Sequence, residues 1–171
     1  PGVVAMAGAC AILHNFSLLC TWRHTSGQRG LGSFSLSNGT VDLGNRMAAA
    51  ISDGNTHNCA ILDDGSVNCW GRNNVGQLGD GSNANRNAPV SVDLGTNTTA
   101  VAIAAGIDHT CAITNTVAVK CWGFNGYGVL ADGTTTNSNV PVQVNHSTGM
   151  RAVAIATTGY GACAIFEKAE V

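Results

Sequence analysis

The stretch His57–Gly81, HNCAILDDGSVNCWGRNNVGQLGDG, is the unit that the rest of the chain repeats. It has two short runs of alternating apolar residues on either side of a turn, Asp63-Asp64-Gly65. Its two cysteines lie at equal distances from Asp64, and a Trp-Gly pair and a glycine-rich loop follow directly. Short apolar runs bounded by Gly, Asn and Asp are typical of strands. The unit therefore predicts an antiparallel hairpin followed by a long loop.

Three further copies, the last one incomplete, become visible when the chain is aligned on the first cysteine of the pair. These first cysteines lie 49, 52 and 52 residues apart. In each complete copy the second cysteine follows ten positions later, and glycines recur seven and twelve positions after it. The positions in register are Cys10, Cys59, Cys111 and Cys163, then Cys20, Cys69 and Cys121, and finally Gly27, Gly32, Gly76, Gly81, Gly128 and Gly133. So many shared registers indicate an internal repeat.

Each complete copy contains four runs with the length and composition of strands. In the third copy they are Ala100–Ala105, His109–Thr114, Val117–Trp122 and Val140–Val144. Pro89 and Pro141 open the fourth run, where a missing N–H does little harm, so this run is expected at a sheet edge. No stretch keeps a helical period, so essentially no helix is expected.

Four short antiparallel strands in a unit of about 50 residues correspond to one blade of a β-propeller. We therefore predict an all-β fold of tandem four-stranded antiparallel blades, about three and a half in number, in an open array rather than a closed ring. The predicted boundaries within this single repeat domain are about 1–45, 46–95 and 99–146 for the three blades and about 150–171 for the half-blade.

The second and third copies share the string H-x-C-A-I, then V-x-C-W-G and a glycine-rich loop. The matching residues are His57, Trp70, Gly71, Asn73, Gly76, Gln77, Leu78, Gly79 and Gly81, and His109, Trp122, Gly123, Asn125, Gly128, Leu130 and Gly133. This string resembles the repeat of the regulator of chromosome condensation (RCC1) family. The first copy departs from the pattern, because Trp22 is displaced by one residue. The resemblance implies a propeller, which in the family usually closes with seven blades.

The cysteine pairs are predicted to form disulfides across the hairpins. Around a turn centred on Asp64, residues whose numbers add up to 128 face each other, and the cysteines of this copy satisfy that relation. Directly opposed residues have Cα atoms about 4.5–5.5 Å apart, which suits a disulfide. Zinc sites use cysteines two to four residues apart, so metal binding fits poorly, and buried free thiols are the remaining alternative. The predicted pairs are Cys10–Cys20, Cys59–Cys69 and Cys111–Cys121.

Cys163 has no partner within its own copy, because the position ten residues later lies beyond Val171. It is expected to be unpaired or to pair with another chain. Disulfides imply an oxidising compartment, so we expect a secreted, extracellular protein. The paired-cysteine form of the repeat resembles secreted relatives of the family rather than its nuclear and cytosolic members.

The composition excludes several classes of function. Charged residues make up 11% of the 171 residues, less than half of the usual quarter. Nucleic-acid binding needs clustered Lys and Arg, and the eight basic residues here are scattered. No apolar run approaches the roughly 20 residues that cross a bilayer, so no membrane span is expected.

Repeated aromatic and histidine side chains are expected to be structural. Trp22, Trp70 and Trp122 should pack between blades, although stacking on sugars or bases is the alternative. His57 and His109 should hydrogen-bond to neighbouring backbone rather than bind a ligand.

The glycine-rich loops lack the Lys-Ser/Thr ending of phosphate loops. Calcium binding beside Asp80 or Asp132 is a weak alternative, because each loop has one carboxylate. No catalytic arrangement stands out, so neither an enzyme nor a cofactor is expected. Candidate glycosylation sequons, all predicted in loops between strands, begin at Asn15, Asn38, Asn97 and Asn145.

Three functional hypotheses follow. The favoured one is a non-enzymatic extracellular scaffold that associates head to tail with other copies of itself in a fibre or polymer, because a half-blade leaves a strand edge and an apolar face uncovered. The second is a fragment of a longer, closed secreted propeller that acts as a protein-binding module or inhibitor. The third, by family analogy alone, is a guanine-nucleotide exchange or chromatin-type regulator.

Overall fold

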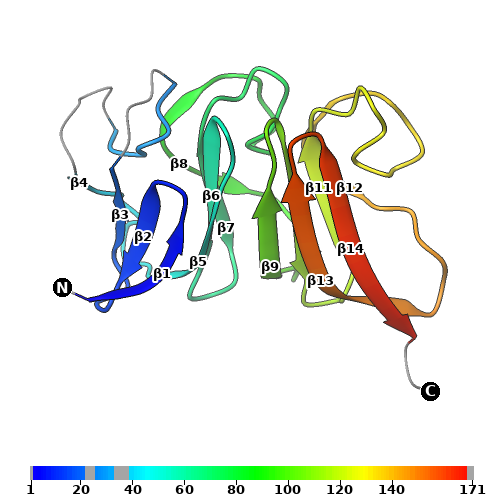
Figure 1. The fold of residues 1–171 in the computed structure, drawn as a ribbon, viewed down its shortest axis with the longest axis horizontal. Helices are drawn as coiled ribbons and strands as arrows, with labels where there is room; N and C mark the ends of the chain where they lie inside the picture. Colours follow the sequence, from blue (N-terminus) through cyan, green and yellow to red (C-terminus); the bar gives the residue numbers. More distant parts are fainter. Residues whose placement is uncertain (1, 22–25, 33–38, 169–171) are drawn as a thin grey trace.

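The structure, a computed structural model, describes residues 2–21, 26–32 and 39–168. Within these residues the chain forms three four-stranded antiparallel sheets and one two-stranded hairpin. The sheets stand next to one another in chain order along the long axis of the molecule, with the N-terminal blade at one end and the hairpin at the other (Figure 1). The predicted all-β architecture of about three and a half RCC1-like blades without a closed ring is confirmed.

In every sheet the strands lie in sequence order, so each strand pairs with the next one along the chain. The first blade contains β1 (Val3–Ala7), β2 (Cys10–Leu13), β3 (Leu18–Cys20) and β4 (Gly39–Thr40). The second contains β5 (Ala48–Asp53), β6 (His57–Leu62), β7 (Val67–Gly71) and β8 (Arg86–Val92). The third contains β9 (Ala100–Ala105), β10 (His109–Thr114), β11 (Val119–Gly123) and β12 (Ser138–Gln143), and the hairpin contains β13 (Met150–Thr158) and β14 (Gly161–Lys168).

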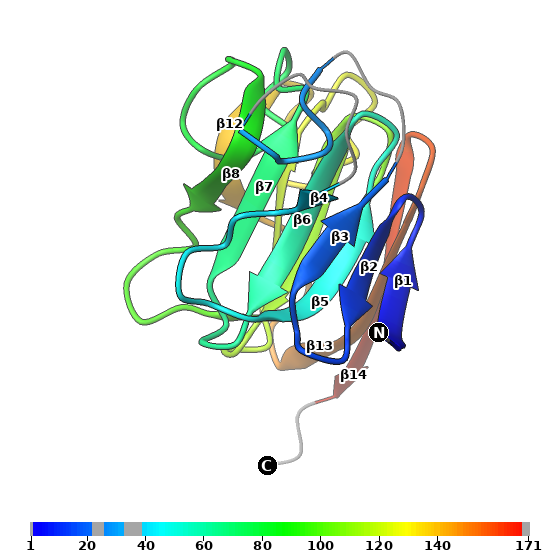
Figure 2. The same cartoon turned by 90° about the vertical axis from the view of Figure 1, so that its left-hand side faces the viewer.

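Neighbouring blades meet face to face through their first two strands. β5 and β6 contact β9, and β9 and β10 contact β13. Viewed from the N-terminal end, the blades lie one behind another, with β8 and β12 on the same outer side (Figure 2). The described part of the chain contains no helix long and apolar enough to cross a membrane.

The hydrophobic core lies between blades. Each of the three buried clusters combines residues of one blade with residues of the next. In the second cluster, for example, Cys59, Cys69 and Leu78 of the second blade pack with Ala112 and Trp122 of the third. A single blade therefore cannot bury its own apolar face, as in other repeat proteins.

The second-to-third-strand hairpins turn through a residue with positive φ. In the second blade this residue is Gly65 (φ 79°), whose N–H donates to the carbonyl oxygen of Leu62 at 2.9 Å. Phe16 and Val117 take the same place in the other blades, each at φ 59°. The sequence predicted a strand from Val117, and this boundary was wrong: β11 begins at Val119, because the turn needs a left-handed residue there.

Prolines occupy the outer edge strands, but not their first residues. Pro89 lies in the middle of β8 and Pro141 in the middle of β12, whereas the sequence placed both at the strand start. β8 and β12 each have one paired neighbour, so the missing N–H of proline can face away from the ladder.

Candidate interaction site: the blade junctions

Three disulfides lie directly across the hairpins. The opposed residues are Cys10 and Cys20, Cys59 and Cys69, and Cys111 and Cys121, with Cα–Cα distances of 4.1, 4.1 and 4.0 Å. All six side chains are buried, and each disulfide belongs to the cluster shared with the following blade. Each disulfide therefore forms part of the surface that the next blade covers.

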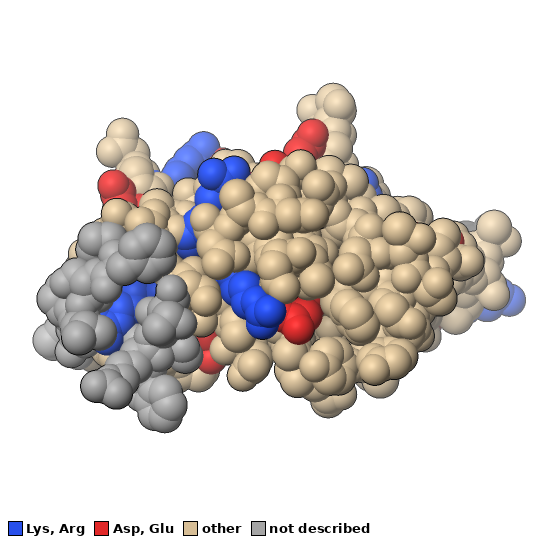
Figure 3. Space-filling view, turned by 90° about the horizontal axis from the view of Figure 1, so that it is seen from above, with Lys and Arg blue, Asp and Glu red and all other residues tan. Residues whose placement is uncertain are grey.

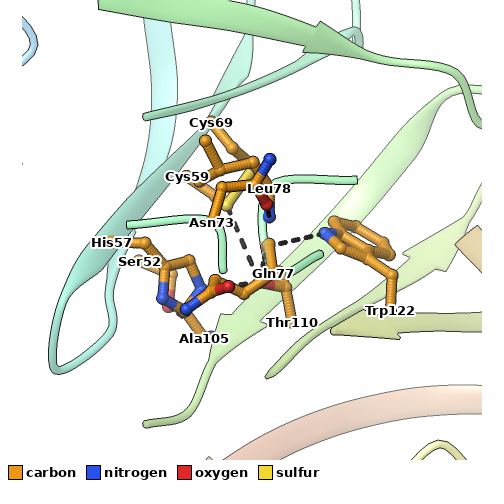
Figure 4. Close-up of a disulfide and its surroundings, with 10 residues drawn as sticks. All are labelled: Ser52, His57, Cys59, Cys69, Asn73, Gln77, Leu78, Ala105, Thr110 and Trp122. Carbon is orange, nitrogen blue, oxygen red and sulfur yellow. Dashed lines mark hydrogen bonds between the residues drawn. A yellow bond between two sulfur atoms is a disulfide. The ribbon is translucent and has the colours of Figure 1, made fainter. Parts of the chain in front are cut away.

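At the second junction, the indole of Trp122 packs against the second blade and donates to its backbone (Figure 4). Trp122 Nε1–H donates to the carbonyl oxygen of Gln77 at 3.0 Å, and the hydroxyl of Thr110 donates to the same oxygen at 3.0 Å. A Cβ atom at Gly79 would lie 2.8 Å from Trp122 Nε1. Glycine at residue 79 is therefore what lets the indole reach the carbonyl.

The first junction repeats this arrangement with other residues. The carbonyl oxygen of Gln28 accepts hydrogen bonds from Trp70 Nε1 at 2.7 Å and from Asn58 Nδ2 at 2.8 Å. A Cβ atom at Gly30 would lie 2.9 Å from Trp70 Nε1. Both junctions thus combine one buried carbonyl, two donors of the next blade and a glycine under the indole.

A buried histidine adds a further link between the second and third blades. His57 Nε2 lies 2.7 Å from the hydroxyl oxygen of Thr110. Because that hydroxyl gives its own proton to the Gln77 carbonyl, His57 must be the donor, with its proton on Nε2. The sequence predicted a backbone partner, and this was wrong for His57, whose partner is a side chain of the next blade. Burial, with a smaller effect of His109, lowers the pKa of His57 to about 3.

The outer strands β8 and β12 also contact the preceding blade at these junctions. The N–H of Gly81 donates to the carbonyl oxygen of Asn139 on β12 at 2.9 Å, and Asn139 Nδ2 donates back to Gly81 at 3.0 Å. A Cβ atom at Gly76 would lie 2.5 Å from the Cα atom of Asn139. In the first junction, Gly27 and Gly32 meet Asn87 of β8 in the same way. Gly27 and Gly76 are therefore required by the next blade as well as by their own turns, whereas a Cβ atom at Gly32 or Gly81 would meet no atom within 4 Å.

The third junction is only half formed. One backbone link, between the first strand of a blade and the hairpin turn of the preceding blade, is present. This inner link is the hydrogen bond from the N–H of Ala152 to the Val117 carbonyl oxygen at 2.9 Å, which corresponds to that from Ala100 to Gly65 at 2.8 Å. Among the described residues, however, β14 pairs with β13 alone, and no indole joins the third cluster. At Gly128, the counterpart of Gly76, a Cβ atom would come no closer than 3.8 Å to an atom of another segment.

A groove of about 250 Å³ remains between the third blade and β14. Its walls are mostly apolar and include the third disulfide. They also include Val129, Ala131, Cys163 and Phe166. Cys163 is a free, exposed thiol. The groove thus occupies the position that Trp122 fills at the second junction.

Comparison with known proteins shows the family to which these repeats belong. Residues 64–113 and 119–165 match the family described as the regulator of chromosome condensation (RCC1) repeat, and residues 49–77 and 100–129 match a second description of the same repeat. The chain belongs to the RCC1 repeat family. It is 34% identical over 110 residues to the ultraviolet-B receptor UVR8 of Arabidopsis thaliana, a match covering 64% of this chain and 25% of that protein. It is 30% identical over 141 residues to the E3 ubiquitin-protein ligase HERC2 of Homo sapiens, covering 77% of this chain and 3% of that one.

Solved structures show the same fold. Human WBSCR16 superposes with a TM-score of 0.80 at 20% identity, covering 91% of this chain and 42% of that one. Yeast RCC1 (Prp20), solved with Kap60, superposes with a TM-score of 0.81 at 16% identity, covering 95% and 40%. The chain thus spans about 40% of the length of these two solved chains, and at such identities the likeness concerns the fold alone.

The other predicted site residues of the RCC1 repeats lie on the surface or outside the described residues. Asn15 is exposed at the tip between β2 and β3, Asn97 in the loop after β8, and Asn145 in the loop after β12. Trp22 and Asn38 lie outside the described residues.

The carboxylates considered for calcium are held by the protein's own donors. Burial would raise the pKa of Asp80, but hydrogen bonds from Ser82 and Arg86 outweigh it and lower that pKa. Asp132 accepts from Thr134 and Asn125. No group of three or more His, Cys, Asp or Glu that could hold a metal ion occurs in the described residues. These carboxylates are therefore held by amide and hydroxyl groups and, at Asp80, also by the Arg86 guanidinium.

An exposed aromatic cluster was not found from the sequence. The rings of Phe124, Tyr127 and Tyr160 lie 5.5–5.9 Å apart, and Tyr127 is 75% exposed. The corresponding positions in the preceding repeat are Arg72, Val75 and Asp108, so a comparison of the copies is the signal that could have shown it. Seen from above, the half of the molecule toward the C-terminal blades presents almost no charged side chains (Figure 3).

Proposed function

We propose that this chain is a non-enzymatic extracellular scaffold that associates head to tail with other copies of itself. The observation that carries the proposal is the half-formed third junction, with its apolar groove and with β14 paired to β13 alone within the described part of the chain. Bare strand edges and uncovered repeat faces favour the addition of further protein.

The two ends of the array are both apolar, but they differ in shape. On β1, Val4 and Met6 are 54% and 72% exposed. On β14, Ile165 is 63% exposed next to the groove. A contact between one kind of end and the other is heterologous, and such contacts build open filaments when the rotation does not close a ring.

The chemistry of the cysteines supports an extracellular location. Disulfides across three hairpins persist in oxidising compartments and are rare in the cytosol. The exposed thiol of Cys163 lies at the open edge, where a partner chain could form a disulfide with it.

A second candidate is a binding module in which further repeats close the ring. It is favoured by the length of the solved propellers, because this chain spans only 40–42% of them. Further repeats would cover the same β14 edge from within one chain. Nucleotide exchange or chromatin regulation rests on family analogy alone, which does not determine function.

Light scattering over a range of protein concentrations tests the self-association. We expect the mass to rise with concentration, and we expect Ile165→Lys at the open edge to prevent this rise. Val101→Lys is the matched control, because Val101 is equally exposed at 61% but lies on β9, within the array. A monodisperse monomer at every concentration, or equal effects of the two variants, would refute the proposal.

The location has its own test. Mass spectrometry of the protein isolated from its natural source should show the cysteines of all three hairpins oxidised. Finding these cysteines fully reduced would refute the extracellular location and would favour an intracellular role.

A further inference from the structure

The first junction has a cavity at the place where the second junction holds a lysine side chain. Lys120 on β11 reaches the second blade, where its ammonium group donates to the carbonyl oxygen of Leu94 at 2.7 Å. Asn68 on β7 takes the equivalent position one repeat earlier, because each of the two residues directly precedes the second cysteine of its hairpin. The side chain of Asn68 is shorter than that of lysine, and it forms no hydrogen bond within the described part of the chain.

The backbone beside the cavity matches the backbone beside Lys120. In both Asp42-Leu43-Gly44 and Asp93-Leu94-Gly95 the glycine N–H donates to the aspartate Oδ1 at 2.8 Å, and the leucine is buried. The space next to the glycine differs. A Cβ atom at Gly95 would lie 3.6 Å from Lys120 Nζ, whereas one at Gly44 would meet no atom within 4 Å. The first junction therefore leaves open the place that an ammonium group fills at the second.

The cavity has a volume of about 420 Å³, which is within the range of small-ligand sites. Both blades that enclose it have all four strands, so it does not arise from an incomplete blade. Leu31, Ala88 and Pro89 supply apolar walls, and Asp42 and Asn68 supply polar groups. Among the described residues that line it there is one carboxylate and no cation, so its charge favours a positively charged ligand.

The acceptors at this cavity match the three N–H bonds of a primary ammonium group. The carbonyl oxygen of Leu43 accepts no hydrogen bond from the described residues, although that of its counterpart Leu94 accepts one from Lys120. Asn68 adds an amide oxygen, and Asp42 adds the carboxylate oxygen that its glycine N–H does not use. Hydrogen bonds between an ammonium group and a carboxylate are among the stronger ones in proteins.

We propose that the cavity at the first junction binds a primary ammonium group on an unbranched alkyl chain, the chemistry of a lysine side chain and of a free alkylamine. The ammonium group takes the place that Lys120 Nζ has at the second junction and donates to Leu43, Asn68 and Asp42. Its alkyl chain lies along the apolar walls. The site is within the array, so it is independent of the proposed association through the ends.

NMR titration of the full chain locates and measures the binding. One probe is a capped peptide with a single lysine between glycines, and its control has norleucine instead, which keeps the alkyl chain but lacks the ammonium group. We expect the lysine peptide to shift the Gly44 backbone and Asn68 side-chain amide signals with a Kd at least about tenfold lower than that of the control, because charge-assisted hydrogen bonds are lost with norleucine. Equal Kd values, or shifts only elsewhere, would overturn the proposal.

Two reciprocal variants exchange the residues of the two junctions. Asn68→Lys gives the first junction the side chain of the second, so we expect the lysine peptide no longer to shift Gly44. Lys120→Asn opens the second junction, so we expect the peptide to shift Gly95 in addition to Gly44. Unchanged binding in Asn68→Lys, or no shift of Gly95 in a Lys120→Asn protein that is folded by circular dichroism, would contradict the equivalence of the two places.

A third variant tests the carboxylate without altering the packing. Asp42 is exposed, and Asp42→Asn keeps an acceptor for the Gly44 N–H while removing the charge. We expect it to weaken the lysine peptide by about threefold and to leave the norleucine peptide unchanged. Equal affinity of the lysine peptide for the two proteins would exclude the carboxylate contact and with it the proposed site.

n-Butylamine distinguishes the two sources of the ammonium group. Tighter binding of the lysine peptide than of n-butylamine would assign the site to a lysine side chain of a partner protein. Equal or tighter binding of n-butylamine would assign it to a free amine. Failure of both probes to shift Gly44 at concentrations up to about 10 mM, where even a weak site is occupied, would overturn the proposal.

Discussion

The second and third junctions have the same backbone framework, but the second is covered by the next blade and the third is partly open. At the second, Trp122, Thr110 and Asn139 of the next blade cover the disulfide, the Gln77 carbonyl and the glycine loop. At the third, the inner link through Val117 is made, and the groove beside the disulfide stays open. The difference shows that the first two strands are enough to place a blade against its neighbour, whereas the third and fourth strands add the indole and the Asn139 contacts that cover the carbonyl and the glycine loop.

The largest expected effect is the loss of the indole at the closed junction. Trp122→Ala should lower the free energy of unfolding by about 3–5 kcal/mol, because it opens a cavity and leaves the Gln77 carbonyl with one donor fewer. Phe166→Ala at the open junction is the comparison, and it should cost clearly less because Phe166 is only partly buried. Urea unfolding followed by circular dichroism measures both. Equal losses would show that the open junction is as tightly packed as the closed one.

Glycine substitutions separate the turn from the junction. Gly76→Ala and Gly128→Ala both place a Cβ atom at positive φ, at 85° and 73°. Gly76 also meets the backbone of β12, so its substitution should cost about 2–4 kcal/mol, against about 1 kcal/mol for Gly128. Thermal unfolding of the two variants gives the difference, and a cost at Gly128 as large as that at Gly76 would mean that its loop is already covered.

The closed junction should also be sensitive to acid through His57. Its pKa is about 3 in the fold and near 6.5 in the unfolded chain, so the unfolded state binds the proton first. This contribution to stability is complete above about pH 6.5 and is lost as the pH falls toward 3. At pH 5 the loss is about 2 kcal/mol.

His57→Gln tests this pH dependence, because glutamine keeps a donor and does not titrate in this range. We expect unfolding free energies measured between pH 7.5 and 5 to decline less steeply in the variant, by about 2 kcal/mol over that range. Burial also lowers the pKa of His109, so some decline should remain. Identical slopes in the two proteins would show that His57 is solvated.

Much of the architecture could be predicted because the informative spacings are local. The ten-residue separation of Cys59 and Cys69 determines the hairpin register, and the recurrence of the unit determines the number of blades. The junction contacts could not be predicted in this way. His57 and Thr110 are 53 residues apart, and which side chains meet depends on how two blades pack. The effect of having alanine at residue 131 likewise depends on a distant contact, because an indole lies over the equivalent residues Gly30 and Gly79.

The smallest expected effect concerns the hairpin tips, where the blades again differ. Val117 is a β-branched, 41% exposed residue held at φ 59°, a conformation that costs such residues about 1–2 kcal/mol. Val117→Gly removes this strain but makes the unfolded chain more flexible, which offsets about 0.5–1 kcal/mol. We expect a net gain of up to about 1 kcal/mol, visible as a raised Tm. The reverse change, Gly65→Val, should destabilise by more than that gain, because a Cβ atom there would lie 2.7 Å from Thr99 of the next blade. A loss of stability in Val117→Gly would show that the valine side chain makes a contact worth more than the strain it bears.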